Sequence, residues 1–353
     1  MLKLRRGVVV STDPLRVEVD GRERPAWADS RLIGEVADGD EVIVNTEALD
    51  LGLGSGGFDV VHANLTRGTA GGGAEGAHVM KLNYTSIQHP VELVERPLDA
   101  GPARRVPLLV LPLHGHLAPA AWAAAGARSG IEVGYVQTAG GALPGSMSRD
   151  VAELRSRGQL AGHVTAGPAY GGEAEAIGVV GALDAAAGRL GWDAILAGPG
   201  PGLIGSETTY GHGGMAALDT AHAALALRLP TLISPRLSGA DPRSRHRGLS
   251  HHTAVVLELA LAPVQVPVPE VEAAAWPTPE GSSAPGPEPG MLDALREACG
   301  DRHDMVVQPV DLEGYAESGL PARTMGRDIG DDPLFFAAAL AAGRALAGAA
   351  VGS

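Results

Sequence analysis

The sequence has few aromatic residues and a single cysteine. Phe, Trp and Tyr together make up 3% of the 353 residues, whereas glycine alone occurs 50 times. The core must therefore be built from aliphatic side chains and close backbone packing rather than from large rings. Because Cys299 is the one cysteine, an intrachain disulfide, a cysteine metal site and a redox pair of cysteines are excluded. This cysteine usage agrees with a reducing compartment, and we expect the protein to be cytoplasmic.

Long uninterrupted apolar runs are also missing. The start, MLKLRRGVVVSTD, is basic, but its apolar run is shorter than the roughly 7–15 residues of a secretion signal. The segment FFAAALAAGRALAGAAV, from Phe335, is interrupted by Arg344 and falls short of the roughly 20 residues of a membrane span. We therefore predict a packed helix there, and we expect neither a secretion signal nor a membrane partner.

Basic residues are outnumbered by acidic ones. The chain contains 27 Lys and Arg against 41 Asp and Glu, which gives a net charge of −14. This charge opposes binding to nucleic acid, and we expect a small solute or a protein as the partner instead. At 353 residues the chain exceeds the usual size of one domain, so its length predicts two.

Residues 1–100 have the pattern of a β-rich domain. The runs GVVVST, LRVEVD, EVIVNT, FDVVHANL and HVMKLNYTSI contain β-branched residues, and turn signals such as DGD and LGLGSGGF separate them. This spacing predicts a small N-terminal β-barrel or β-sandwich.

Residues 101–353 have the pattern of an α/β domain. From Val106 onward, short apolar runs alternate with glycine-rich loops and Ala/Leu-rich helical stretches, which is the βα repeat of a mainly parallel, Rossmann-like, three-layer α/β fold. The predicted strands are VPLLVLPL, IEVGYVQ, GHVTA, WDAILAG, PTLIS and APVQVPV. Helices are predicted at about 119–128, 148–157, 172–190, 213–227 and 250–261. A Pro- and Gly-rich linker or excursion at 270–290 follows, and a helix, the strand DMVVQPV and a last helix from about Pro333 complete the sheet.

The loops after the predicted strands carry most of the polar chemistry of this domain. They hold six of the 12 histidines and four arginines: His114, His116, His212, His246, His251, His252, Arg236, Arg243, Arg245 and Arg247. In an open parallel sheet such loops converge at the carboxyl ends of the strands, where ligands bind. The pattern therefore predicts a ligand site at this edge. The alternative is that loops hold polar residues in any α/β protein and that the histidines only cap helices.

The stretch RHRGLSHHT, residues 245–253, concentrates positive charge. Ser250 precedes an apolar helical run, which predicts a helix N-cap with free backbone N–H groups and the positive end of the helix dipole beside it. Arg245 and Arg247 lie on the approach, and Gly248 allows the backbone to come close. Because arginine binds phosphate or carboxylate with a planar fork, we predict that these four residues bind an anionic group. Alternatively, the arginines pair with acidic residues and only hold the loop.

The loop GPGPGLIG formally matches the dinucleotide motif GxGxxG through Gly200, Gly202 and Gly205. It lies in the fourth βα unit and continues into a polar loop rather than a helix, so it does not indicate an NAD site. We predict instead that these glycines form a backbone wall against the anionic ligand.

Three histidines, His114, His251 and His252, are the candidate catalytic residues, because an imidazole can accept a proton near pH 7. A serine nucleophile motif is incomplete, since GLSHH around Ser250 lacks the final glycine of GxSxG. No P-loop sequence is present.

No metal ligands are assigned from the sequence. The pairs His114 with His116 and His251 with His252 lack the HExxH spacing that places two ligands on one helical face. The cofactor is therefore left unknown. A divalent metal remains an alternative, with a few carboxylates in the same loops, namely Glu173, Glu207 and Asp241.

Six stretches carry a resemblance to a known family: DLGLGSGGFD, HVMKLNYTSIQ, GGALPGSMS, GPGPGLIGSETTYGHGG, ADPRSRHRGLSHHT and TMGRD. Through them nearly the whole chain resembles an uncharacterised bacterial family, domain of unknown function 3866 (DUF3866). The resemblance supports the fold and brings no established activity. Two positions depart from the family pattern: His116 stands where a glutamine is usual, and Ala139 where an aspartate is usual. A reaction that needed that aspartate would be lost in this chain.

Two functions follow from these observations. The first is an enzyme acting on a small anionic metabolite, phosphorylated or nucleotide-like, at the carboxyl edge of the sheet. Arg245 and Arg247 would hold the anion, and His114, His251 or His252 would move a proton. The second is a non-catalytic metabolite sensor or protein-interaction module, which the missing nucleophile motif and the scarce carboxylates favour. Association into a homo-oligomer is left open.

Overall fold

The computed structural model describes residues 1–353 apart from 54–55, 74–75, 271–289, 291 and 351–353. The chain divides into two compact units, Met1–Glu92 and Leu93–Ser353. The linker predicted at 270–290 lies outside the described residues, except for Glu270 and Gly290 at its ends.

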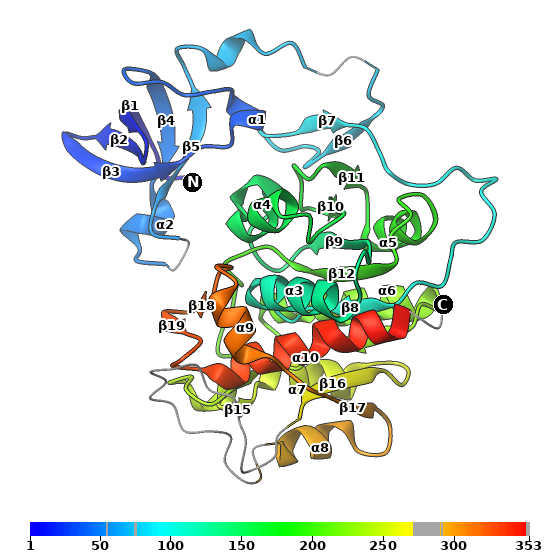
Figure 1. The fold of residues 1–353 in the computed structure, drawn as a ribbon. Helices are drawn as coiled ribbons and strands as arrows, with labels where there is room; N and C mark the ends of the chain where they lie inside the picture. The colour runs from blue at the N-terminus through cyan, green and yellow to red at the C-terminus, as the bar shows by residue number, and fades with distance from the viewer. Residues whose placement is uncertain (54–55, 74–75, 271–289, 291, 351–353) are drawn as a thin grey trace. The chain divides into compact units, whose positions relative to one another are not determined.

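The first unit is built around a small closed β-barrel (Figure 1). Its strand order is β1-β2-β3-β5-β4, and neighbours are antiparallel except for the parallel pair β3 and β5. Val17, Val42 and Val44 point inward and are fully buried, because successive side chains of a strand alternate between its two faces. The sequence predicted either a β-barrel or a β-sandwich, and the β-barrel is confirmed. Its strands are β1 (Leu4–Thr12), β2 (Leu15–Val19), β3 (Arg22–Trp27), β4 (Glu41–Asn45) and β5 (Asp59–Asn64).

Short elements complete this unit. Two single-turn helices and a 3₁₀ turn connect the barrel strands or follow them, and an antiparallel hairpin comes last. These elements are α1 (Ser30–Ile33), α2 (Glu47–Asp50), η1 (Gly68–Ala70), β6 (Val79–Lys81) and β7 (His89–Val91).

The second unit contains an eight-stranded sheet in the order β11-β10-β9-β12-β8-β13-β16-β17. Every neighbouring pair in it is parallel, so the predicted Rossmann-like α/β fold is confirmed. The strands are β8 (Leu108–Val110), β9 (Val133–Thr138), β10 (Gly162–Ala166), β11 (Ala174–Ala176), β12 (Ala194–Pro199), β13 (Thr231–Ile233), β16 (Gln265–Pro269) and β17 (Asp304–Gln308).

Helices cover both faces of the sheet and create two aliphatic cores. Leu108 and Val110 of β8 belong to one core, whereas Leu109 and Leu111 belong to the other, as the period of two in a strand requires. One core includes residues of α5 (Val179–Gly188), α6 (Ala216–Ala226), α7 (His251–Leu259) and α8 (Asp293–Cys299). The other includes residues of α3 (Leu117–Ala127), α4 (Arg149–Ser156), α9 (Leu312–Glu317) and α10 (Pro333–Ala349).

The apolar segment from Phe335 forms most of α10, which lies beside α3 (Figure 1). A Cβ at Gly343 would collide with the carbonyl of Ala120, so glycine at this position lets the two helices approach closely. Phe335 and Phe336 are buried in the core. Among the described residues, no helix is long and apolar enough to cross a membrane.

The helix predicted at 172–190 is wrong in its first part. Ala174–Ala176 form the edge strand β11, and α5 begins only at Val179. The carboxylate of Glu175 accepts hydrogen bonds from Thr165 Oγ1 at 2.6 Å and from the Gly171 N–H at 2.5 Å, which ties this segment to β10. The tripeptide Ala-Glu-Ala has no β-branched residue, so tertiary contacts override its helical propensity.

The strand order reverses direction next to β8. From β8 the chain moves outward through β9, β10 and β11, and then returns to place β12 between β9 and β8. It continues on the other side of β8 with β13. Ligands of open α/β sheets bind outside the carboxyl ends of the strands at such a reversal.

Candidate functional site

The loops after β9 and β12 pack against each other through backbone atoms. The N–H of Ala142 donates to the Pro201 carbonyl at 2.7 Å, and the N–H of Ile204 donates to the Gly140 carbonyl at 3.1 Å. A Cβ at Gly200 would collide with the Ala142 carbonyl, so this glycine permits the contact. Gly202 has φ 72°, which favours glycine, and Gly205 forms a β-bridge with His212. A role of Gly200, Gly202 and Gly205 against a ligand stays a prediction.

Four of the predicted loop histidines, His212, His246, His251 and His252, gather into one group, here called the histidine cluster. The rings of His212 and His252 stack with centroids 3.7 Å apart. The centroid of His251 lies 4.3 Å from that of His252, and the centroid of His246 lies 5.0 Å from that of His251. Thus the loops after β12 and β13, the two strands that flank β8, meet in space, as expected for carboxyl ends at one edge of a parallel sheet.

The histidine cluster is held by the start of α7. Ser250 is its N-cap, as predicted, and its Oγ accepts the His252 N–H at 3.3 Å. The Ser250 Oγ also lies 2.7 Å from Nδ1 of His246. Gly248 has φ 68°, a left-handed conformation that favours glycine, at the start of the short strand β15 (Gly248–Leu249). β15 pairs with β14 (Leu237–Ser238) and brings Ser250 beside the end of β13.

All four histidines of the cluster are neutral at pH 7. Burial, reinforced by the charge of Arg236, lowers the pKa of His246 to about 3. Burial, reinforced by His212, lowers the pKa of His252 to about 2. Burial also lowers the pKa values of His212 and His251. A neutral imidazole has a lone pair that can accept a proton or bind a metal ion.

Some nitrogens of the cluster lack a partner among the described residues. They are the buried Nδ1 atoms of His212 and His252. One ligand nitrogen from each of His212, His251 and His252 lies within 4.8 Å of the others, so within the described part of the chain these three form a group that could hold a metal ion. The three carboxylates considered from the sequence, Glu173, Glu207 and Asp241, are not part of this group.

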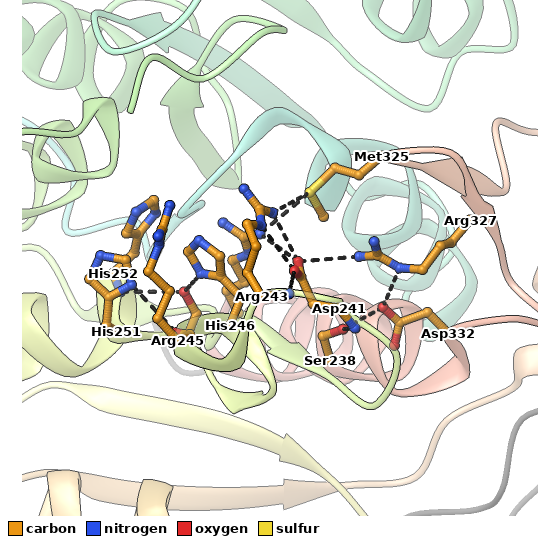
Figure 2. Close-up of polar contacts among 12 residues, drawn as sticks. Ser238, Asp241, Arg243, Arg245, His246, His251, His252, Met325, Arg327 and Asp332 are labelled. Atoms are coloured by element: carbon orange, nitrogen blue, oxygen red, sulfur yellow. Dashed lines mark hydrogen bonds and ion pairs between the residues drawn. The ribbon is translucent and has the colours of Figure 1, made fainter. Parts of the chain in front are cut away.

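Beside the histidines, three arginines surround two buried aspartates. Arg236 Nη2, Arg243 Nη2 and Arg327 Nη2 lie 3.3, 2.9 and 3.4 Å from Asp241 Oδ2. Arg327 Nε lies 3.1 Å from Asp332 Oδ2. Figure 2 shows Arg243 and Arg327 reaching Asp241 from opposite sides. Together the five residues are called the arginine cluster.

The two aspartates are fixed by the short strand β14. The Ser238 hydroxyl donates to Asp332 Oδ2 at 2.5 Å and accepts the Asp241 N–H at 2.9 Å. The N–H of Gly239 donates to Asp332 Oδ1 at 2.9 Å. Both aspartates are therefore held in place by backbone and hydroxyl groups as well as by arginines.

One positive charge of the arginine cluster is unmatched, since three guanidinium groups face two carboxylates. Arg236 is only 3% exposed, and its Nε has no hydrogen-bond partner among the described residues. Burial and the neighbouring charge of Arg243 lower the pKa of Arg236 to about 10, so it stays protonated at pH 7. Burial opposes ionisation of Asp241, but its hydrogen bonds with Arg243 and the nearby charges hold its pKa well below the usual range.

The two arginines singled out in the sequence lie at the edge of this group. Arg245 Nη1 is 3.7 Å from Glu207 Oε1, and that carboxylate is 92% exposed, so the ion pair is weak. Arg247 is exposed, and no side-chain hydrogen bond or ion pair is recorded for it within the described part of the chain. Their role in binding an anion stays a prediction.

Arg327 is not among the residues predicted from the sequence, and it lies in the short hairpin of β18 (Arg323–Thr324) and β19 (Arg327–Asp328). Its partner Asp241 is 86 residues away in the chain. The one signal for it in the sequence is the stretch TMGRD, residues 324–328, which was noted only as part of the family resemblance.

A separate group surrounds His114. Its Nδ1 lies 3.2 Å from the Pro199 carbonyl, which can only accept, so Nδ1 carries the proton. Nε2 then accepts the hydroxyl proton of Ser148 at 2.7 Å. Ser148 is the N-cap of α4, and Asp150 Oδ2 lies 3.8 Å from the same Nε2. Ser148 was not predicted as a site residue from the sequence. Both His114 and Ser148 are buried.

His116, where the resemblance makes glutamine usual, is fully buried. Its Nδ1 lies 2.8 Å from Ser234 Oγ, and its ring packs edge-on against Phe335 at 4.7 Å. Burial and the charge of Arg236 lower its pKa to about 3. It is therefore a neutral core residue.

A family model described as "Protein of unknown function (DUF3866)" matches residues 25–343. No curated protein and no solved structure matches the chain. The matched range contains the whole histidine cluster and the whole arginine cluster.

Proposed function

The chain belongs to the DUF3866 family of proteins of unknown function, and we propose that it is an enzyme that binds a small phosphorylated metabolite at the carboxyl edge of its parallel sheet. The observation that carries this proposal is the unmatched guanidinium charge of the arginine cluster, beside neutral imidazoles. The histidines, Arg236, Arg243 and Asp241 lie in loops after β12 and β13, next to the reversal of strand order, and Arg327 and Asp332 reach Arg236's group from the segment before α10.

The charge of the arginine cluster supports an anionic ligand. A buried charge without a counterion is costly, and an incoming anion removes that cost. The unpartnered Nε of Arg236 and the half-exposed side chain of Arg243 offer planar donors of the type that bind phosphate oxygens. The N-terminus of α7, capped by Ser250, adds a favourable dipole for a negative charge nearby.

The neutral histidines support chemistry on that ligand. His251 is the half-buried member of the cluster, and its Nδ1 lies 3.4 Å from the Arg245 carbonyl. Because a carbonyl can only accept, this contact leaves Nε2 of His251 as the atom with a free lone pair. Nε2 can accept a proton from a substrate or hold a metal ion that activates water.

A second function, a sensor that binds the metabolite without converting it, is favoured by one observation. Two of the three predicted catalytic histidines, His114 and His252, are only 8% and 6% exposed. A proton acceptor must come within hydrogen-bond reach of its substrate, so turnover through either residue requires an opening of the loops.

The test is a ligand screen by thermal unfolding in EDTA, with inorganic phosphate, phosphorylated metabolites and nucleotides. A ligand at about a hundred times its dissociation constant stabilises the folded protein by about 2.7 kcal/mol. We expect Arg243→Gln to lose this stabilisation, whereas Arg302→Gln, an exposed arginine after α8, keeps it. An unchanged shift in Arg243→Gln would overturn the anion site.

Turnover is tested separately, by following each stabilising compound with the purified protein by phosphorus NMR. A changed spectrum supports the enzyme, and loss of the change in His251→Gln assigns the residue. Stabilisation by a compound that is never converted supports the sensor.

A further inference from the structure

We infer that His212, His251 and His252 form a binding site for one divalent transition-metal ion of the zinc type, with an anion or water as a further ligand. One ring nitrogen from each of the three residues lies within 4.8 Å of the other two. Imidazole nitrogen suits zinc, cobalt and nickel, whereas magnesium and calcium prefer oxygen ligands. Zinc binds such nitrogens at about 2.0–2.1 Å, so modest side-chain rotation brings all three into range.

Two unpartnered nitrogens lie close to the same backbone position, Gly214. A Cβ placed on Gly214 would lie 2.9 Å from Nδ1 of His212 and 3.1 Å from Nδ1 of His252. Both of these nitrogens are buried and lack a hydrogen-bond partner among the described residues. Glycine at position 214 therefore leaves free the space beside both nitrogens, which a Cβ would occupy.

The remaining ring nitrogens are arranged as in metal-binding histidines. His212 Nε2 lies 3.1 Å from the Thr209 carbonyl, and His251 Nδ1 lies 3.4 Å from the Arg245 carbonyl. A carbonyl accepts an N–H, so these contacts fix Nδ1 of His212 and Nε2 of His251 as the lone-pair atoms. A ligating histidine commonly donates its other N–H to a backbone carbonyl in this way.

The charges around the three histidines select the kind of metal complex. The ligand group contains no carboxylate among the described residues, and the charges of Arg236 and Arg245 act on His251. A bare dication is opposed by these arginines, whereas a dication that also carries an anion is not. Three protein ligands with an open position is the pattern of catalytic rather than structural zinc sites. We therefore expect phosphate to tighten metal binding, an expectation that rests on the proposed function, whereas the metal site itself does not.

The experiment is calorimetric titration of the full-length, EDTA-treated and dialysed protein with zinc chloride, without phosphate. We expect one equivalent to bind, and we expect the affinity to fall more than about 100-fold in His251→Ala and in His252→Ala, because loss of a ligand exceeds the 10–100-fold effect of a supporting residue. His78→Ala, an exposed histidine of the first unit, is the matched control and should bind as the wild type does.

Two measurements keep the result interpretable. His251 is half-buried, so His251→Ala should fold, which far-UV circular dichroism in EDTA checks. Cobalt added to the wild type should give visible absorption bands of a nitrogen-ligated ion. Absence of zinc binding and of these bands overturns the site, as does unchanged affinity in both variants. If zinc binds and phosphate leaves its affinity unchanged, the metal site stands and the anion-binding function fails.

Discussion

Carboxylates and cations are matched differently in the two units. In the barrel unit, Asp40 pairs with Arg67, and Asp50 and Asp59 pair with Arg24 and Lys3, so cations and carboxylates are equal in number. In the α/β unit, three arginines face Asp241 and Asp332, so one positive charge is left over. A matched set is complete without a ligand, whereas an unmatched one is completed by an anion.

The two units also differ in whether their buried polar atoms have hydrogen-bond partners. Asp40 accepts hydrogen bonds from Arg67, from Asn64 at 2.8 Å and from the Ala37 N–H at 2.9 Å. In the α/β unit, by contrast, seven buried side-chain atoms lack partners among the described residues, and three of them, Arg236 Nε and the Nδ1 atoms of His212 and His252, lie in the two clusters. Buried polar atoms are nearly always paired in proteins, so this local concentration of exceptions marks the candidate site.

The largest expected effect is that of Asp241→Asn. Asp241 is fully buried, and its loss leaves three arginines against one carboxylate. Removal of one partner from a buried ionic group costs about 3–5 kcal/mol, so the unfolding transition of the α/β unit in urea should shift by that amount. Inorganic phosphate should restore more stability to this variant than to the wild type. Asp301→Asn, at an exposed position, should change stability by less than about 0.5 kcal/mol.

A pair of substitutions compares the two units directly. Arg24→Met leaves the buried Asp59 without its guanidinium partner and should destabilise the barrel by about 3 kcal/mol. Arg236→Met leaves Arg243 and Arg327 to balance the charges of Asp241 and Asp332, so in the absence of ligand it should change stability by less than about 1 kcal/mol. Urea unfolding of both variants decides the comparison. Equal destabilisation would mean that Arg236 is an ordinary structural ion pair.

Acid should weaken the two units in different pH ranges. The hydrogen bond from Arg67 lowers the pKa of Asp40 to about 2, so its stabilisation is present above the unfolded pKa of about 3.9 and is lost as the pH falls below it. For His246, with a folded pKa of about 3, the unfolded chain takes up the proton first, below its own pKa of about 6.5. Stability of the α/β unit should therefore begin to fall near pH 6.5, and that of the barrel only near pH 4.

This difference can be measured by thermal unfolding in EDTA at a series of pH values. Between about pH 7 and about pH 5 the melting temperature of the α/β unit should fall by a few degrees. His252→Asn should reduce the fall, because one group with a depressed pKa is removed. His78→Asn should leave it unchanged, since that side chain is exposed. A flat profile down to pH 5 would contradict the neutral state of the histidine cluster.

The fold was largely predictable because the apolar runs are longer than turns and shorter than helices. Runs such as WDAILAG became β12, and the histidine loops converged because the carboxyl ends of parallel strands share an edge. β11 was not predictable, since Ala-Glu-Ala is held by contacts of Glu175 with Thr165 and Gly171. The amino-acid pattern of a single segment does not show its hydrogen bonds to other segments.

Within the candidate site, the individual residue conformations that could be predicted were those set by neighbouring residues in the sequence. Gly248 and the Ser250 N-cap depend on neighbouring residues, and both have the conformations that the sequence requires. Ser148 and Arg327 were missed because their partners His114 and Asp241 are 34 and 86 residues away. The unpaired nitrogens of the histidine cluster could not be predicted from the sequence either, because whether an atom has a partner depends on the folded chain.

The smallest expected effect on stability belongs to the exposed arginines. Arg245 forms a long ion pair with an exposed carboxylate, so Arg245→Ala should change the free energy of unfolding by less than about 0.5 kcal/mol. If Arg245 and Arg247 bind the anion, as the sequence predicts, then each alanine variant should weaken the binding of an identified phosphorylated ligand about tenfold with stability intact. If affinity falls only in Arg243→Gln, the arginine cluster binds the anion. Arg245 and Arg247 then only attract the ligand as it approaches the site. Titration calorimetry on the three variants separates these outcomes, because all three positions are exposed enough to fold without their arginine.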